Sequence, residues 1–174
     1  RMGGSITVTS QLGVGSTFVI TLPFEIAPSP EQTPDAHAAP DISIAGCRLL
    51  LVEDNALNAE IAQILLTDEG ATVTVVTDGK QAVEIVQNNP PDTFDAVLMD
   101  VMMPVMNGID AAKTIRSLNR PDAKTLPIIA MTANAFYEDA QKCLAAGMNA
   151  HLAKPLEIDK VIAVISRCTR NTRT

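Results

Sequence analysis

Three carboxylates follow two short apolar runs of the sequence. The run Leu49–Val52 leads directly into Glu53 and Asp54, and Val97–Met99 leads into Asp100. If both runs are parallel strands of one sheet, their carboxyl ends meet at the same edge, and the three acids lie close together. Neighbouring carboxylates repel one another by about 4 kcal/mol per pair at an effective dielectric constant near 20, so such a cluster requires a cation.

Oxygen ligands of this kind favour Mg²⁺, which keeps several waters and accepts only one or two protein carboxylates together with phosphate oxygens. Two further polar residues end apolar runs: Thr132 follows Met131, and Lys154 follows Ala153. The Lys154 ammonium could neutralise a phosphoryl group, and the Thr132 hydroxyl could donate a hydrogen bond to it. The set predicts phosphoryl transfer to a carboxylate nucleophile.

Short apolar runs alternate with longer amphipathic segments from Cys47 onward. We expect strands at Arg48–Val52, Thr72–Thr77, Ala96–Met99, Pro127–Met131 and Ala150–Leu152. We expect helices at Leu57–Thr67, Lys80–Gln87, Gly108–Leu118, Tyr137–Ala146 and Ile158–Arg167. The alternation predicts an α/β fold in which a doubly wound, five-stranded parallel sheet has helices on both faces.

The first 45 residues follow a different pattern. Ser5–Thr9 and Thr17–Leu22 alternate polar and apolar residues on either side of a glycine-containing turn, which predicts a β-hairpin. Residues 25–45 are rich in Pro and Ala and show no sustained periodicity, which indicates a linker. We therefore expect a hairpin at 1–24, a linker at 25–45 and the α/β domain at 46–170.

The composition limits the possible partners. Of the 174 residues, 47% are hydrophobic, which is enough for one full core. A net charge of −7 argues against nucleic acid binding, because phosphate backbones are bound by clustered Lys and Arg. No apolar run approaches the ~18 residues that a membrane span requires, so we expect this chain to be cytoplasmic and to make no membrane contact. A membrane anchor, if a longer parent protein has one, would lie in parts that are not present here.

The three cysteines are far apart in the sequence, at Cys47, Cys143 and Cys168. Their spacing fits neither a zinc site nor a disulfide framework. We expect buried thiols in a reducing compartment.

Four blocks of the sequence resemble the signature motifs of response-regulator receiver domains. They are Val52-Glu53-Asp54-Asn55, Met99-Asp100-Val101-Met102-Met103-Pro104, Met131-Thr132-Ala133 and Lys154-Pro155. The match covers about Cys47 to Cys168, and each block falls at an expected strand end. The resemblance implies a flavodoxin-like fold with strand order 2-1-3-4-5.

The same resemblance implies a role for each acid. Glu53 and Asp54 would be the metal-binding acids, and the backbone carbonyl of Met102 would complete the shell of the Mg²⁺ ion. Asp100 would be both a metal ligand and the residue that accepts the phosphoryl group.

The remaining implied roles belong to the later blocks. Thr132 would be the switch hydroxyl, and Lys154 would pair with the phosphate, placed by a cis peptide bond to Pro155. His151 stands three residues before Lys154, where the family often has an aromatic switch residue, so we assign it to the switch while its action there stays open. Asn107 replaces a common aspartate in what we interpret as a turn.

Two features resemble the receivers that are attached to sensor kinases: the pair Asn55 and Asn58, and the run Met131–Ala135. The segment from Met2 to Pro23 resembles the last hairpin of a histidine-kinase ATP-binding domain. A hybrid histidine kinase is implied, with its own phosphohistidine domain as donor and a histidine phosphotransfer protein as acceptor. Because the rest of the ATP-binding domain is absent, we expect this chain to be a phosphoacceptor module that does not bind ATP.

Two other functions are compatible with such a fold. A Mg²⁺-dependent phosphohydrolase of small phosphate esters would also use Asp100 as nucleophile, but it normally has a second acid two residues later, where this chain has Met102. A flavin carrier needs a Ser/Thr/Gly-rich phosphate loop after the first strand, where Glu53 and Asp54 stand. For the receiver function, we expect a partner helix to dock on Asn55–Thr67 and the loop Met102–Met106.

Overall fold

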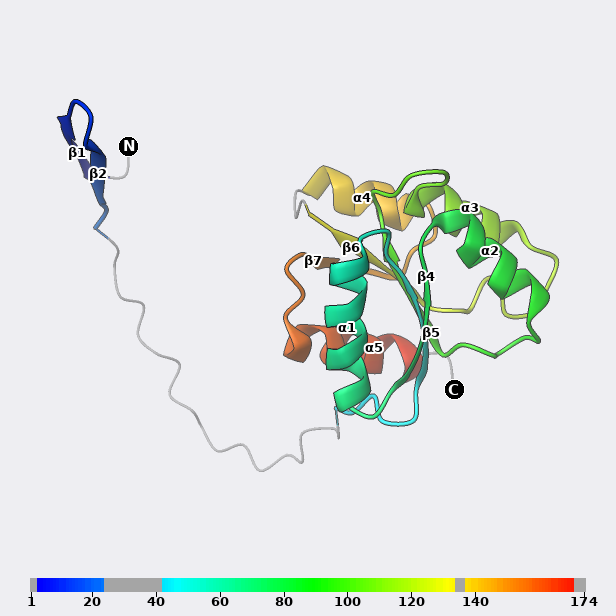
Figure 1. The fold of residues 1–174 in the computed structure, drawn as a ribbon. Coiled ribbons are helices and arrows are strands. Elements are labelled where there is room, and N and C mark those ends of the chain that lie inside the picture. The colour runs from blue at the N-terminus through cyan, green and yellow to red at the C-terminus, as the bar shows by residue number, and fades with distance from the viewer. Residues whose placement is uncertain (1–2, 24–41, 134–136, 171–174) are drawn as a thin grey trace. The chain divides into compact units, whose positions relative to one another are not determined.

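The computed structural model describes residues 3–23, 42–133 and 137–170. The chain divides into two compact units, Arg1–Ala38 and Ala39–Thr174, whose elements are labelled in Figure 1. Of the linker expected at 25–45, only residues 42–45 lie within the described ranges.

The first unit contains a β-hairpin, as the alternating pattern predicts. Strands β1 (Ser5–Gln11) and β2 (Gly15–Thr21) are antiparallel. Each strand is longer than expected on the side of the turn. The register pairs Ile6 with Ile20 and Val8 with Phe18, so these four apolar side chains share one face. All four are more than half exposed.

The second unit contains the expected parallel sheet. Its strands are β3 (Arg48–Val52), β4 (Thr72–Val76), β5 (Ala96–Asp100), β6 (Ile128–Thr132) and β7 (Ala150–Ala153). Their order in the sheet is β4-β3-β5-β6-β7. This is the predicted order 2-1-3-4-5, and the prediction is confirmed.

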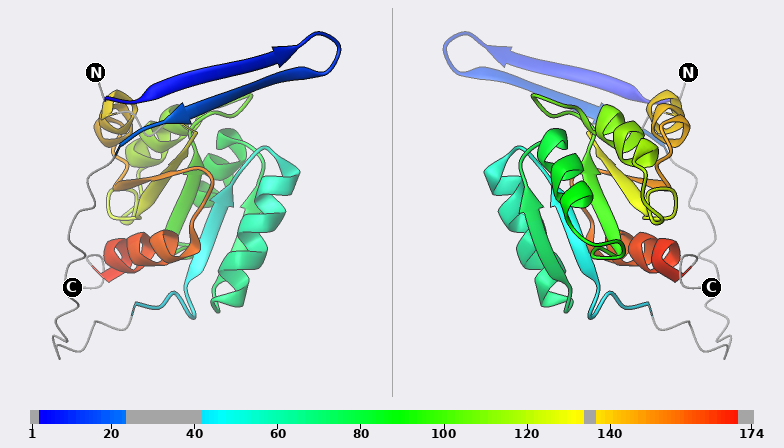
Figure 2. Two further views of the ribbon diagram at one scale, coloured as in Figure 1. Left: turned by 90° about the vertical axis from the view of Figure 1, so that its left-hand side faces the viewer. Right: turned by 90° about the vertical axis from the view of Figure 1, so that its right-hand side faces the viewer.

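Helices cover both faces of this sheet, as Figure 2 shows from two sides. They are α1 (Ala56–Asp68), α2 (Gly79–Asn88), α3 (Gly108–Ser117), α4 (Tyr137–Ala145) and α5 (Ile158–Arg170). One core cluster joins strand residues such as Leu50 to α2, α3 and α4, and the other joins residues such as Leu49 to α1 and α5. Successive strand residues face opposite sides of the sheet, and helices cover both sides. Every residue of Leu49–Val52 is therefore fully buried, which explains why this run is uninterrupted and apolar.

Polar caps begin the helices that follow strands β3 and β5. The Asn55 side chain accepts hydrogen bonds from the backbone N–H groups of Leu57 and Asn58, and so fixes the start of α1 three residues after Glu53. The side chain of Asn107 accepts from the N–H of Asp110 and caps α3. The residue that we interpreted as a turn substitution is therefore a helix cap.

Two expectations from composition can be compared with the structure. Cys47 and Cys143 are buried as expected, whereas Cys168 is only partly buried. Within the described ranges, no helix has the length and apolar character that crossing a membrane would demand.

Candidate functional site

The three predicted acids lie together at the carboxyl edge of the sheet. Glu53 directly follows β3, and Asp100 is the last residue of the neighbouring strand β5. One carboxylate oxygen from each of Glu53, Asp54 and Asp100 lies within 4.8 Å of the others. Glu53 and Asp100 are buried, while Asp54 is exposed. The cluster is therefore open to solvent on the side of Asp54.

Lys154 bridges the two buried acids. Its Nζ lies 2.5 Å from Oε2 of Glu53 and 2.6 Å from Oδ2 of Asp100. Burial alone would lower the pKa of Lys154, but the hydrogen bonds and charges of Asp100 and Glu53 outweigh it and raise this pKa above its usual value. The ammonium therefore stays charged and offsets the repulsion between the two carboxylates.

Strand pairing positions Lys154 and Thr132 beside Asp100. Asp100 lies opposite Met131 in the register of β5 and β6, and the buried Thr132 follows as the last residue of β6. The backbone N–H of Lys154 donates to the carbonyl of Thr132 at 2.8 Å, and the peptide bond between Lys154 and Pro155 is cis. These residues thus lie at adjacent strand ends on one edge.

The loop after β5 holds the Asp100 carboxylate from the other side. The backbone N–H of Met102 donates to Oδ1 of Asp100 at 3.0 Å, so the Met102 backbone lies at the site while its side chain is 76% exposed. Gly108, the first residue of α3, packs against this strand end, since a Cβ atom there would lie 2.2 Å from the Asp100 carbonyl oxygen. Only glycine allows α3 to begin this close to Asp100.

His151 does not join the acid cluster. It lies on the edge strand β7, opposite Ala130 in the register, and it is exposed. The group of potential metal ligands found in the described part of the chain contains only Glu53, Asp54 and Asp100. The switch roles of His151 and Thr132 stay predictions.

One contact of the site was not foreseen from the sequence. The side-chain amide of Asn58, in the first turn of α1, donates from Nδ2 to Oε1 of Glu53 at 3.0 Å. In the sequence, the pair Asn55 and Asn58 indicated only a receiver subclass. Its three-residue spacing does place one asparagine at the cap of a helix and the other one turn further on, facing the strand end.

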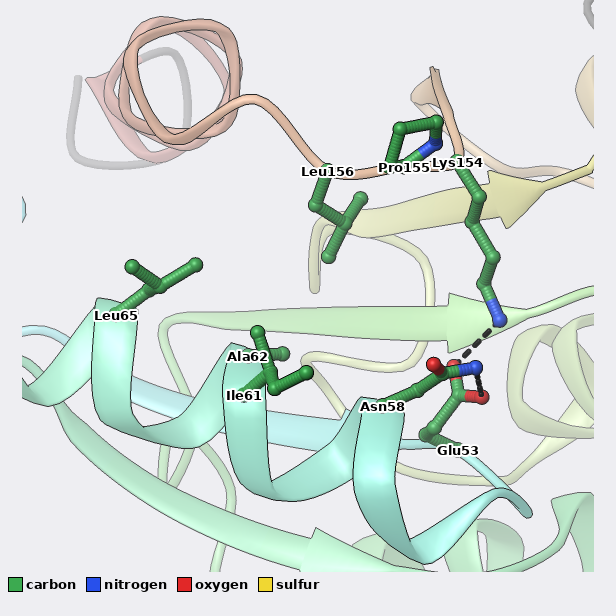
Figure 3. A pocket seen from close by; sticks show the side chains of 8 residues that line it. All are labelled: Glu53, Asn58, Ile61, Ala62, Leu65, Lys154, Pro155 and Leu156. Atoms are coloured by element: carbon green, nitrogen blue, oxygen red, sulfur yellow. Dashed lines mark hydrogen bonds and ion pairs between the residues drawn. The ribbon is translucent and has the colours of Figure 1, made fainter.

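A groove of about 420 Å³ leads away from the acid cluster along α1. Its lining residues, shown in Figure 3, are Glu53, Asn58, Ile61, Ala62, Leu65, Lys154, Pro155 and Leu156. Helix α1 forms one wall, as expected for a partner face. The other wall is the segment that begins at Lys154, and the loop Met102–Met106, which we expected there, contributes no lining residue.

Comparison with known proteins agrees with this geometry. Residues 49–166 match the family model of the response regulator receiver domain. The receiver domain of a sensor histidine kinase from Pseudomonas aeruginosa PAO1, solved with a magnesium ion coordinated in its active site cleft, superimposes with a TM-score of 0.65 and 40% identity. That match covers 72% of this chain and 99% of the other chain.

Longer relatives are sensor kinases. The aerobic respiration control sensor protein ArcB of Escherichia coli K12 is 38% identical over 168 residues, which are 96% of this chain and 21% of ArcB. The hybrid signal transduction histidine kinase B of Dictyostelium discoideum is 39% identical over 124 residues, which are 66% of this chain and 6% of that kinase. This chain thus spans about a fifth or less of the length of these relatives.

The alignment with ArcB includes residues that lie before the receiver match. Because it leaves out only about 4% of the chain, it covers most of the hairpin β1–β2 as well. The hairpin therefore fits a fragment of a kinase that precedes the receiver. With the family match over 49–166 and the acid cluster in place, the chain belongs to the response regulator receiver domain family, and it is homologous to the receivers of hybrid histidine kinases.

Proposed function

We propose that this chain is the receiver of a two-component phosphorelay, and that Asp100 accepts the phosphoryl group from a phosphohistidine. The observation that carries the proposal is the placement of Asp100 between Lys154, which donates to Oδ2, and the backbone N–H of Met102, which donates to Oδ1. A carboxylate whose two oxygens are each held by a donor is oriented for attack on a bound phosphorus atom.

The reaction exchanges one bond for another at phosphorus. A carboxylate oxygen of Asp100 forms the new O–P bond, the N–P bond to the donor imidazole breaks, and the imidazole leaves with the electron pair. The Lys154 ammonium neutralises the Asp100 carboxylate before the transfer and the phosphoryl oxygens after it. The Thr132 hydroxyl, at the end of the adjacent strand, donates a hydrogen bond to the same group.

Glu53, Asp54, Asp100 and the carbonyl of Met102 would hold Mg²⁺ in this site. The residues fit the ion because the three carboxylates offer only hard oxygen ligands within 4.8 Å of one another, and because the exposed Asp54 leaves room for waters. When bound, the ion neutralises negative charge between the carboxylates and the phosphoryl oxygens.

The partners are a phosphohistidine domain of a kinase, in the same parent chain, and a histidine phosphotransfer protein that receives the phosphoryl group. The groove supports this assignment, since its walls offer the apolar side chains of Ile61, Leu65 and Leu156, and its inner end reaches Glu53 and Lys154. An amphipathic helix that docks there places a histidine next to the acid cluster.

We also propose that the chain consists of three parts. Residues 1–24 are the final hairpin of a kinase ATP-binding domain, residues 25–45 are a linker, and residues 46–170 are the receiver. A phosphohydrolase function is not proposed, because the side chain at position 102 is an exposed methionine and has no proton to give to a leaving group.

Acetyl phosphate tests the function without a protein partner. With Mg²⁺ and acetyl phosphate, the wild type should gain the mass of one phosphoryl group in intact mass spectrometry, and Asp100→Asn should gain none. Asp68→Asn, which changes an exposed aspartate on α1, is the matched control and should behave as wild type. Labelling of Asp100→Asn to the wild-type extent would overturn the proposal.

A further inference from the structure

The two oxygens of the Glu53 carboxylate are held by two different parts of the fold. Oε1 accepts from Nδ2 of Asn58 in α1, at 3.0 Å, and Oε2 accepts from Nζ of Lys154 in the segment after β7, at 2.5 Å. We propose that Asn58 is a positioning residue for phosphoryl transfer. Its side-chain amide fixes the orientation of the Glu53 carboxylate, and this orientation keeps the Lys154 ammonium shared between Glu53 and Asp100. The inference rests on the proposed function of Asp100.

Glu53 needs such a restraint because of its length. Its side chain has three rotatable bonds, and the sheet edge fixes only its backbone. The residue is only 3% exposed, so in the folded protein its carboxylate relies on protein donors. The amide of Asn58 therefore selects one orientation of the carboxylate, and Figure 3 shows the dashed contacts from Asn58 and Lys154 to the end of the Glu53 side chain.

The backbone of α1 presents Asn58 in a fixed place. The cap residue Asn55 binds the N–H groups of Leu57 and Asn58 at 3.1 Å each, so the first turn of the helix is held at both positions. An asparagine suits this place because its amide is a neutral donor of the required length. Aspartate would bring a fourth negative charge to the cluster, and alanine would have no donor.

The orientation of the Glu53 carboxylate affects Asp100 through Lys154. Its ammonium is shared between Glu53 and Asp100, at 2.5 and 2.6 Å. If Glu53 turns away, the ammonium keeps only Asp100 as a partner and occupies the carboxylate that a metal ion and a phosphoryl group must reach. Loss of Asn58 should therefore weaken metal binding and slow phosphorylation together.

Neither Mg²⁺ binding nor labelling by acetyl phosphate involves a protein partner, so docking in the groove does not enter these measurements. Gln63 is an exposed residue of the same helix that does not line the groove. A substitution at Gln63 changes the surface of α1 and leaves the Glu53 carboxylate as it is. A difference between variants at Asn58 and Gln63 thus reports on the positioning role.

The experiment compares the variants Asn58→Ala, Gln63→Ala, Glu53→Ala and the double variant Asn58→Ala/Glu53→Ala. Mg²⁺ alone is titrated into each protein by calorimetry, and the rate of labelling by acetyl phosphate is measured separately. We expect Asn58→Ala to weaken Mg²⁺ binding about tenfold, as is typical when a hydrogen bond behind a metal ligand is removed, and to slow labelling. Gln63→Ala should match wild type in both measurements.

The double variant identifies the route. If Asn58 acts through Glu53, its removal has no further effect once the carboxylate is gone, so the double variant should equal Glu53→Ala. If the two substitutions reduce Mg²⁺ affinity and the labelling rate independently, so that their effects multiply in the double variant, Asn58 does not act through Glu53. Asn58 is exposed and alanine favours helix, so Asn58→Ala should fold, which a thermal melt verifies.

A failure of the proposed function and a failure of the role of Asn58 give different results. If the wild type itself takes no phosphoryl group at Asp100, the proposed function fails. If the wild type is labelled and Asn58→Ala binds Mg²⁺ and takes the phosphoryl group as wild type does, only the role of Asn58 is refuted.

Discussion

Nζ of Lys154 lies 2.6 Å from Oδ2 of Asp100, although the two residues are 54 positions apart in the sequence. The sequence led us to expect three mutually repelling carboxylates that wait for a metal ion. In the structure, the ammonium already neutralises part of the charge, since it contacts both buried acids and only the exposed Asp54 lies outside its reach of hydrogen bonding. The site is therefore less strained without metal than the carboxylates alone would imply.

Lys154→Ala should destabilise the metal-free protein. The change leaves Glu53 and Asp100 buried beside each other without a cation, and breaking a buried pair in this way costs about 3–5 kcal/mol. We expect the low end, because the Lys154 side chain is 20% exposed. Mg²⁺ should raise the melting temperature of the variant more than that of wild type.

The control for this prediction is Lys160→Ala, which removes an ammonium that is 68% exposed and pairs with Glu157 at the surface. It should change the free energy of unfolding by less than about 1 kcal/mol. Equal stability of Lys154→Ala and Lys160→Ala in the absence of Mg²⁺ would show that Lys154 does not neutralise the acids.

Gly108→Ala should destabilise the protein and displace the backbone that carries Asp100. The added methyl group would lie 2.2 Å from the carbonyl oxygen of Asp100, so either α3 or the end of β5 must move. Overpacking of this kind costs about 1–3 kcal/mol, and the displacement should also slow labelling by acetyl phosphate. Lys113→Ala, at an exposed position of the same helix, should leave both quantities unchanged; a Gly108→Ala protein with wild-type stability and rate would exclude this packing constraint.

Ile61→Arg should separate docking from chemistry. Ile61 lines the groove and is half exposed, so a charged side chain there blocks an apolar partner without entering the core. Transfer from a phosphohistidine protein should slow at least tenfold, while labelling by acetyl phosphate continues at the wild-type rate. Gln63→Arg adds the same charge at an exposed α1 position that does not line the groove, and it should spare both reactions. If Ile61→Arg and Gln63→Arg behave alike, the groove is not the docking surface.

The ion pair of Arg120 and Asp122, outside the acid cluster, contributes to the stability of the fold in acid. Asp122 is buried, and the hydrogen bonds of Arg120 hold its pKa below the usual value despite the opposing effect of burial. A depressed pKa means that the carboxylate stabilises the fold above its unfolded pKa near ~3.9, and that this contribution disappears as pH falls towards the folded pKa.

Asp122→Asn should therefore lower the free energy of unfolding near neutral pH by about 1–2 kcal/mol, because the partly buried Arg120 loses its charged hydrogen-bond partner. The difference between wild type and variant should narrow as pH falls below about 4. Urea unfolding at several pH values measures it. A difference that stays constant down to pH 3 would mean that the charge of Asp122 is not the cause.

The sequence was sufficient for the sheet because its strands are buried on both faces. Uninterrupted apolar runs such as Leu49–Val52 are bounded by charged or turn residues, so strand β3 was predicted with the bounds that the structure has. The strand ends then placed Asp100 and Lys154 at one edge by topology alone. No side-chain geometry was needed for that step.

The contacts within the site could not be predicted in the same way. Lys154 bridges to Glu53 across 101 residues, and Asn58 reaches the same carboxylate from α1. Which oxygen accepts from which donor depends on rotamers and on the crossing of α1 with the segment after β7, and local sequence patterns carry neither. The same limit explains why the sequence did not indicate that Leu156, in the segment after β7, lines a groove together with α1.

The most direct test of the account identifies the residue that carries the phosphoryl group. The protein is treated with acetyl phosphate and Mg²⁺, the acyl phosphate is reduced with borohydride, and the digested peptides are sequenced by mass spectrometry. We predict that position 100, and no other aspartate, is converted to homoserine, and only when acetyl phosphate was present. Homoserine at position 54 with Asp100 intact, or no conversion in a protein that gained phosphoryl mass, would contradict it.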